Sequence, residues 1–320
     1  MPVKNAAPFL RECITSILNQ SETNWQLIAV DDGSTDQSLS ILNEFATADK
    51  RISVQQNQGK GIIDTLRTAY SFSSGALITR MDADDRMPKD KLMVLKQNLL
   101  SRGQGHLAVG LVQYFSDDVL QGGYQYYEAW LNGLTSKGNN YSDIYRECVI
   151  PSPCWMVYRV DLDKCGAFNS DTYPEDYDLC FRFYSEGLKP IPCSEVLHHW
   201  RDHAARSSRN DPNYADNRFL ELKLKWFLKL DYDPTKTLVV WGAASKGKAL
   251  AKSLIQAQIP FEWRCNNPNK IGKVVYDKLI HNVNSILELE EFQAIIAVAN
   301  KAEQAEIRAQ LSVSQAFFFC

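Results

Sequence analysis

The carboxylates best placed for chemistry follow apolar segments of the chain. Asp82, Asp84 and Asp85 come shortly after the apolar run 76–79. A short apolar run bounded by turn residues is typical of a buried parallel strand, and in open α/β sheets ligands bind beyond the carboxyl ends of such strands. Asp82 and Asp84 are two residues apart, so on extended backbone they share a face and can offer two oxygen ligands to a divalent cation that carries a diphosphate. A solvated acidic turn before a helix opened by Pro88 would explain the same residues without chemistry.

A second pair of carboxylates, Asp31 and Asp32, follows the apolar run 25–30. The carboxyl ends of parallel strands lie at one edge of a sheet, so we expect this pair at the same edge as the first motif. Lys60 lies between two glycines in the turn 58–61, where it could reach a phosphate. A strand-turn-helix corner with an ordinary loop lysine is the structural alternative.

Two further clusters occur in the second half of the chain. Glu175 and Asp176 open a helical pattern, and the helix dipole by itself favours acidic side chains in a first turn. Arg201, His203 and Arg206 belong to the most basic local stretch of the sequence. Histidines near a strand end are often satisfied core or surface residues, so each cluster has a structural explanation as well as a functional one.

The elements that must position these residues follow from hydrophobic periodicity. Up to Asp85 the chain alternates strand and helix patterns, which predicts a right-handed doubly wound sheet. Expected strands cover residues 25–30, 51–55, 76–79 and 106–115, and expected helices cover residues 9–18, 39–45 and 62–73. Two prolines in residues 148–156 predict a constrained loop there.

Taken together, the motifs PVKN, VDDGSTD, GKG and ITRMDADD resemble those of the family 2 glycosyltransferases. The resemblance rests on their order and spacing, and with the later motifs it extends over about two thirds of the chain. It implies an α/β fold with a GT-A type doubly wound sheet, mixed but mainly parallel. It also implies a nucleotide-diphosphate sugar as the donor.

The same resemblance implies roles on the donor side. The donor would be bound by Pro2, Asp31, Asp32, Lys60, Asp82, Arg201 and Arg206, and Mn²⁺ or Mg²⁺ would be held by Asp84, Asp82 and His203. The departing diphosphate gains negative charge as the glycosidic bond breaks. The cation and the guanidinium groups would stabilise that charge.

On the acceptor side, the resemblance implies that Asp176 is the general base, because a sugar hydroxyl must lose its proton as it attacks the anomeric carbon. Glu175 would orient or hydrogen-bond the acceptor. A single base opposite the leaving nucleotide implies an inverting transfer. The acceptor could be a growing surface polysaccharide, a lipid-linked oligosaccharide or a protein. The aromatic stretch 124–130 stands where family members receive acceptors, although such a stripe at helical spacing is more often core.

Two other classes of protein stay open at this point. A strand-end Asp-x-Asp also serves phosphatase-like hydrolases, whose first Asp is a nucleophile. Arg86 and Met87 stand where that chemistry expects small hydroxyl residues. The other class is a non-catalytic scaffold that binds a sugar nucleotide, and the intact Asp82, Asp84 and Asp176 argue against it.

We expect two domains, a catalytic domain over residues 1–232 and a small Rossmann-like α/β domain over residues 236–320. In the second, expected strands cover residues 237–241, 261–265, 294–298 and 316–319, and expected helices cover 245–258 and 301–311. Residues 242–249 nearly reproduce the phosphate-binding GxxxxGK[ST] loop, but Ala249 replaces the hydroxyl residue that would ligate Mg²⁺. An NTPase is therefore disfavoured, and the small domain implies no chemistry by itself.

Composition excludes further classes. The 320-residue chain is 45% hydrophobic and has a formal net charge of −3, so it has no basic excess with which to bind nucleic acid. Eight cysteines without CxxC spacing indicate reduced, mostly buried thiols.

The expected location is the cytoplasm, because no apolar run approaches a membrane span and the N-terminus has no signal-peptide pattern. Peripheral association with the inner face of the membrane is compatible with this expectation, and the sequence does not indicate an oligomeric state. Few residues precede the PVKN motif, so we expect either a very short first strand or a native start upstream.

Overall fold

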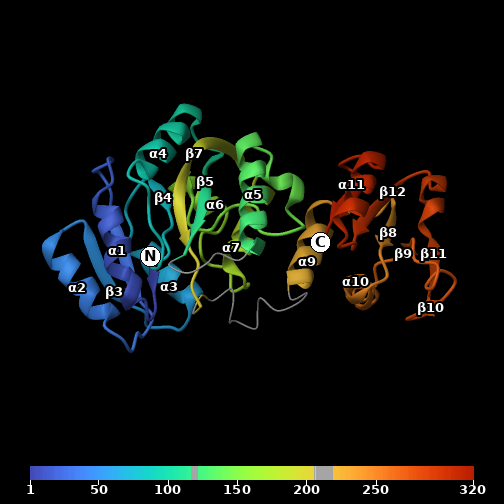
Figure 1. The fold of residues 1–320 in the computed structure, drawn as a ribbon, viewed down its shortest axis with the longest axis horizontal. Helices are drawn as coiled ribbons and strands as arrows, with labels where there is room; N and C mark the ends of the chain where they lie inside the picture. The colour runs from blue at the N-terminus through green and yellow to red at the C-terminus, as the bar shows by residue number, and fades with distance from the viewer. Residues whose placement is uncertain (117–121, 205, 207–218) are drawn as a thin grey trace. The chain divides into compact units, whose positions relative to one another are not determined.

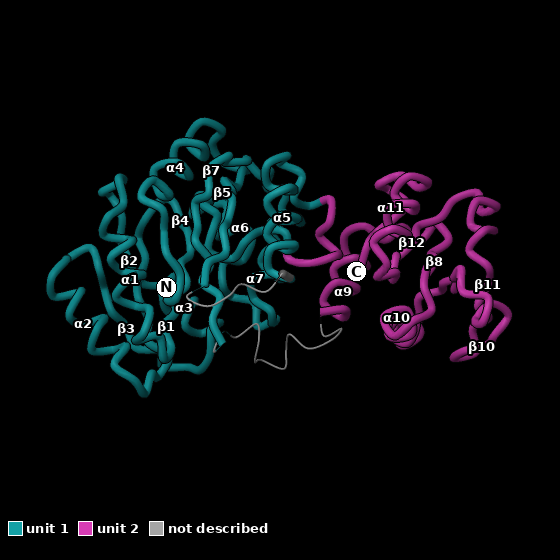
Figure 2. The backbone as a smooth tube through the Cα atoms, viewed as in Figure 1, with its two compact units in different colours: residues 1–141, 149–207 teal, residues 142–148, 208–320 magenta. Residues whose placement is uncertain are grey.

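The computed structural model describes residues 1–116, 122–204, 206 and 219–320. It divides into two compact units, which are described separately: unit 1 is residues 1–141 with 149–207, and unit 2 is residues 142–148 with 208–320 (Figure 1, Figure 2). Helix α9 (Phe219–Leu230) belongs to unit 2 in this division. The domain boundary at residues 232–236 stays a prediction.

Unit 1 begins with a three-stranded parallel sheet of order β1-β2-β3. Its strands are β1 (Pro2–Val3), β2 (Leu27–Asp31) and β3 (Ile52–Gln56), and its helices are α1 (Ala7–Leu18), α2 (Ser38–Ala48) and α3 (Ile62–Ser71). The first strand has two residues, which pair with Val30 and Asp31. These elements confirm the strands and helices predicted for this region, with slightly shifted ends.

The second sheet of unit 1 is mixed and has the order β4-β6-β5-β7. Its strands are β4 (Leu77–Thr79), β5 (His106–Phe115), β6 (Trp155–Tyr158) and β7 (Lys189–Arg201). The prediction that residues 148–156 form a loop was wrong at Trp155 and Met156, which belong to β6. β6 pairs antiparallel with β4 on one side and with β5 on the other, and partners so distant in sequence leave no local signal.

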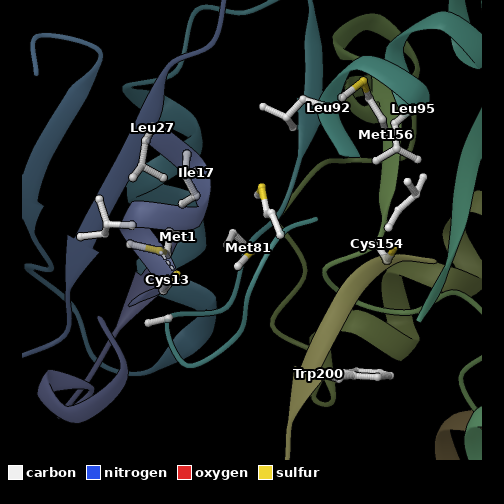
Figure 3. Packing of buried hydrophobic residues seen from close by; sticks show 14 of the residues in the cluster. Met1, Cys13, Ile17, Leu27, Met81, Leu92, Leu95, Cys154, Met156 and Trp200 are labelled. Carbon is white, nitrogen blue, oxygen red and sulfur yellow. Dashed lines mark hydrogen bonds between the residues drawn. The ribbon is translucent and has the colours of Figure 1, made fainter. Parts of the chain in front are cut away.

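One apolar core joins the two sheets of unit 1. Its buried residues include α1, β2, α4 (Lys91–Arg102), β5 and β7 positions, and Figure 3 shows Met81 among them. Helix α5 (Gly122–Lys137) contributes Leu131 and partly buried aromatic residues to this core. All eight cysteines are free and six of them are buried, as predicted.

Two helices complete the described part of unit 1. They are α6 (Arg159–Lys164) and α7 (Glu175–Ser185). A 3₁₀ turn, η1 (Asn140–Asp143), runs from unit 1 into the short segment 142–148 that belongs to unit 2. Among the described residues, no helix is both long and apolar enough to cross a bilayer.

Unit 2 contains a six-stranded sheet of order β10-β11-β9-β8-β12-β13, in which only the β10–β11 pair is antiparallel. The strands are β8 (Thr237–Trp241), β9 (Glu262–Cys265), β10 (Val274–Val275), β11 (Lys278–Asn282), β12 (Phe292–Ile296) and β13 (Ala316–Phe318). The helices are α9, α10 (Ser245–Gln256), the 3₁₀ helix η3 (Val283–Glu288) and α11 (Lys301–Gln310). The sequence did not predict β10 and β11.

The glycines after β8 have a packing reason. A Cβ atom on Gly247 would lie 2.0 Å from the carbonyl oxygen of Gly242, and one on Gly242 would lie 2.9 Å from that of Ala297. Gly242 also has φ +123, which favours glycine. Close contact between α10 and the end of β8 therefore explains why this stretch resembles a phosphate-binding loop.

Replacing Gly247 with Ala tests this packing. The Gly247→Ala variant should lower the free energy of unfolding by about 1–3 kcal/mol, because the methyl group overpacks the contact. The control is Gly133→Ala in α5, where a Cβ atom meets nothing within 4 Å. That change should stabilise the helix by about 0.5–1 kcal/mol. Denaturant unfolding measures both, and equal effects would contradict the packing explanation.

Candidate active site

The turn that follows β4 contains three neighbouring carboxylates, which differ in their exposure to solvent. Met81 is buried in the core and fixes the start of the turn. The side chains of Asp82 and Asp84 stay 25% and 28% exposed, whereas that of Asp85 is only 1% exposed. The two acids spaced for a shared face are therefore available to a ligand, and the third one is part of the interior.

Arg80 links this turn to the acidic pair at the start of α7. Its buried guanidinium lies between two carboxylates, with Nε 3.2 Å from Asp82 Oδ1 and Nη1 2.9 Å from Glu175 Oε1. Burial alone would lower the pKa of Arg80, but the charges of Asp82, Glu175 and Asp176 outweigh it, so the pKa is raised and the group stays charged. Arg80 thus brings together two motifs that lie 95 residues apart.

Arg80 was not predicted to be a functional residue, although it stands inside the motif ITRMDADD. Its signal was a cation at the end of an apolar strand, where a buried charge needs a partner. The partner, Glu175, becomes visible only once the chain is folded.

Asp176 has a carboxyl group with a raised pKa. Its side chain accepts a hydrogen bond of 2.8 Å from the backbone N–H of Tyr177. Burial and the neighbouring charge of Glu175 raise the pKa of Asp176 to about 7, while Arg80 and the Tyr177 N–H oppose that rise. A carboxylate with a pKa near neutrality is suited to act as a general base.

Asp84 and His203 place two side-chain atoms that are able to ligate a metal ion next to each other. His203 Nε2 lies 2.9 Å from Asp84 Oδ2, and the imidazole ring packs against Phe9 with centroids 4.5 Å apart. Carboxylate oxygen and imidazole nitrogen together suit Mn²⁺, and Mg²⁺ commonly completes its shell with water and substrate phosphate oxygens. Two adjacent donors therefore fit such an ion. Among the described residues, no group of three or more His, Cys, Asp or Glu side chains is arranged to hold one.

Asp31 and Asp32 lie at the carboxyl end of β2 in different environments. Asp32 accepts hydrogen bonds from Lys4, Asn57 and the backbone N–H of Gly61. Burial raises the pKa of Asp32, but these donors outweigh it and the pKa is lowered. Asp31 Oδ2 accepts one bond from the N–H of Ser34, whereas its buried Oδ1 has no partner in the described part of the chain.

The other residues expected on the donor side are placed as follows. Pro2 lies in β1 beside Val30, so it shares the sheet edge with Asp31. Lys60 is exposed in the turn before α3, with its N–H bonded to Asp64 Oδ2 at 3.0 Å. Pro2 is therefore part of the parallel sheet, whereas Lys60 lies in the turn between β3 and α3.

Arg201 and Arg206 have partners inside the protein. Arg201 Nε donates to the carbonyl oxygen of Asp84 at 2.8 Å, and its Nη2 pairs with Glu12. Arg206 lies over the rings of Tyr114 and Trp200, at 5.3 and 5.1 Å from their centroids. Both rings are buried in the core of unit 1. In the aromatic stretch 124–130, Tyr124, Tyr127 and Trp130 pack against the same core, as expected for a stripe at helical spacing, whereas Tyr126 is exposed.

Comparison with known proteins shows which family the sequence of this chain matches. The family described as "Glycosyl transferase family 2" matches residues 1–166. A protein of Haemophilus influenzae named "Uncharacterized glycosyltransferase" is 30% identical over 321 residues, which is 93% of each chain. Glycosyltransferase GlyA of Streptococcus pneumoniae is 28% identical over 217 residues, 65% of this chain but only 31% of that protein.

Solved structures share the fold at low sequence identity. The complex of S. aureus TarS 1-349 with UDP-GlcNAc has a TM-score of 0.54 and 16% identity, covering 79% of this chain and 70% of that one. Mannosyltransferase PcManGT from Pyrobaculum calidifontis, in complex with GDP-Man and Mn²⁺, has a TM-score of 0.51 and 17% identity, covering 80% and 74%. The predicted GT-A type α/β fold is confirmed. With carboxylates at the strand ends of such a fold and a family match over half of its length, this chain belongs to glycosyl transferase family 2 and is an enzyme that transfers sugars.

Proposed function

We propose that this glycosyltransferase is metal-dependent and inverting, and moves a sugar from a nucleotide-diphosphate donor to a hydroxyl acceptor. One observation carries the proposal: the buried Arg80 joins Asp82, in the motif expected to face the donor, to Glu175, beside the expected base. A transfer needs both substrates at one place, and this ion pair holds the two motifs within the reach of one side chain.

On the donor side, Asp84 and His203 would hold Mn²⁺ or Mg²⁺, with Asp82 beside them. The ion, when bound, neutralises charge that develops on the departing diphosphate. Asp31 and Asp32, at the carboxyl end of β2, would line the pocket for the nucleotide base together with Pro2, as the family resemblance implies.

The cations have distinct parts in this proposal. Lys60 is exposed and able to meet a phosphate, whereas Arg201 is bonded to Asp84 and Glu12. Arg201 would therefore act on the diphosphate mainly through the position of Asp84. Arg206 lies on an aromatic surface next to residues outside the described part of the chain, and its role in donor binding is a proposal from the family resemblance.

On the acceptor side, Asp176 removes the proton of the attacking hydroxyl. Its carboxylate is available above about pH 7, where the group has lost its own proton. Glu175 is held by Arg80 and would orient the acceptor. A single base acting on the hydroxyl, with the nucleotide leaving from the opposite face, inverts the anomeric centre.

The substrate class is proposed from the relatives. TuaG of Bacillus subtilis is named a putative teichuronic acid biosynthesis glycosyltransferase, and it is 34% identical over 94 residues. We infer that this chain acts in surface polysaccharide or glycoconjugate synthesis, with a carbohydrate, lipid-linked or protein acceptor. An enzyme that acts on such acceptors would work in the cytoplasm or at the inner face of the membrane.

Nucleotide binding tests the donor site. Calorimetry with UDP-, GDP- and dTDP-sugars should show binding of one donor class in the presence of Mn²⁺ and much weaker binding without it. Asp84→Ala should abolish the metal-dependent part, because it removes a ligand. Glu44→Gln, an exposed change on α2, is the control and should bind like the wild type. Binding of none of the panel by the wild type would count against the proposal.

The pH dependence of transfer tests the base. The value of kcat/KM should fall as the pH drops below about 7, because protonation of Asp176 removes the base. Asp176→Asn should lower kcat by about 10²–10⁴-fold. An unchanged rate in Asp176→Asn would exclude this residue as the base.

Arg80 should influence the pH at which kcat/KM falls on the acidic side of the profile. Its charge lowers the pKa of Asp176, so Arg80→Met should shift the acidic limb of kcat/KM to higher pH, whereas Arg80→Lys should shift it less. Circular dichroism checks that both variants are folded. A limb that stays in place in folded Arg80→Met would show that Arg80 does not act on the base.

A further inference from the structure

Three polar residues outside the proposed site are buried together in unit 1. Lys91 of α4 and His198 of β7 are 0% exposed, and Asp85 in the turn after β4 is 1% exposed. Lysine and aspartate are almost never fully buried unless they are paired. Three such groups from three separate elements therefore call for a common explanation.

These residues form one chain of hydrogen bonds. Lys91 Nζ lies 2.5 Å from the carbonyl oxygen of Pro153 and 3.0 Å from His198 Nδ1. His198 Nε2 lies 2.9 Å from Asp85 Oδ2. A lysine ammonium can only donate, so Nδ1 of His198 accepts and its Nε2–H donates to Asp85. The direction of both hydrogen bonds of His198 therefore follows from Lys91, which can only donate.

The far end of this chain is attached to the proposed metal and diphosphate site. Asp85 Oδ1 accepts the backbone N–H of Arg201 at 2.7 Å, and Arg201 Nε donates to the carbonyl oxygen of Asp84. Backbone bonds of 3.0 and 3.1 Å between Arg86 and His199 close the same junction. The turn after β4 is thus fastened to β7 on both sides of Asp85.

We propose that Lys91, His198 and Asp85 are positioning residues, which together set where Asp84 and His203 stand for the metal and its diphosphate. This inference rests on the proposed function. The three residues touch neither ion nor substrate. They act through the two oxygens of Asp85, one held by His198 and the other holding the strand that leads to His203.

Substitutions of His198 can distinguish a role in positioning the metal ligands from a contribution to stability alone. In His198→Gln, the amide can still accept from Lys91 through its oxygen and donate to Asp85 through its NH₂ group. His198→Leu fills a similar volume but makes neither bond. His198→Asn keeps the amide oxygen and the NH₂ group, but its shorter side chain cannot bring them to both Lys91 and Asp85.

A buried lysine in unit 2 provides the matched control. Lys223 is 6% exposed and donates to the carbonyl oxygen of Arg146 at 2.7 Å, much as Lys91 donates to Pro153. Lys91→Met and Lys223→Met should both lower the unfolding temperature. Only Lys91→Met should weaken metal binding.

The readout is Mn²⁺ binding by the full chain in the presence of UDP or GDP, measured by calorimetry, together with the unfolding temperature of the metal-free protein. His198→Leu, His198→Asn and Lys91→Met should each weaken Mn²⁺ binding about 10-fold or more, as expected when a group that orients a metal ligand is lost. His198→Gln should recover most of the affinity, and Lys223→Met should bind like the wild type.

The outcomes separate this inference from the proposed function. A wild type without Mn²⁺-dependent UDP or GDP binding would overturn the proposed function and this inference with it. A wild type that binds, with folded His198→Leu and Lys91→Met variants of unchanged affinity, would overturn the positioning role alone. Equal losses in His198→Gln and His198→Leu would do the same. If His198→Leu does not fold, Lys91→Met with its control decides the question.

Discussion

The arrangement of unit 1 depends on charges that are buried in pairs where its strands end. A guanidinium such as that of Arg80 can lie in the interior only because Asp82 and Glu175 compensate it. The same two contacts hold the carboxylates of Asp82 and Glu175 beside Arg80. Burial raises the pKa of Asp176, and the charge of the adjacent Glu175 raises it further, because one cation does not compensate both carboxylates. Because Arg80 must be compensated, Asp82 and Glu175 are its ion-pair partners, and Asp176 is left as the proposed base.

The two sheets of unit 1 give these pairs their rigidity. Met81 is packed in the core that both sheets share, so the acids that follow it start from a fixed point. Neutral hydrogen-bonded groups complete the support: His198 is kept uncharged by burial and by Lys91, which lower its pKa well below its usual range. An uncharged imidazole can accept from one neighbour and donate to the other. Rigid support of this kind is what a site needs if its ligands must stand within a fraction of an ångström of their working positions.

Unit 2 shows how a local motif can mislead when it is considered alone. Its glycines stand nearly at the spacing of a phosphate-binding loop, yet Gly247 is needed because the carbonyl oxygen of Gly242 leaves no room for a Cβ atom. Close helix-strand packing selects the same residue type as close approach to a phosphate. Only the neighbours in space distinguish the two causes.

The sequence by itself determined the alternation of strands and helices and the strand ends at which carboxylates gather. It could do so because periodicity and turn residues are local properties, as the run 106–115, which became β5, illustrates. Tertiary structure alone decided the partners: β6 between β4 and β5, Arg80 between Asp82 and Glu175, and the burial of Asp85 while Asp82 and Asp84 stay accessible. Those outcomes depend on contacts between residues far apart in the chain, and no local pattern records the desolvation that selects among three neighbouring acids.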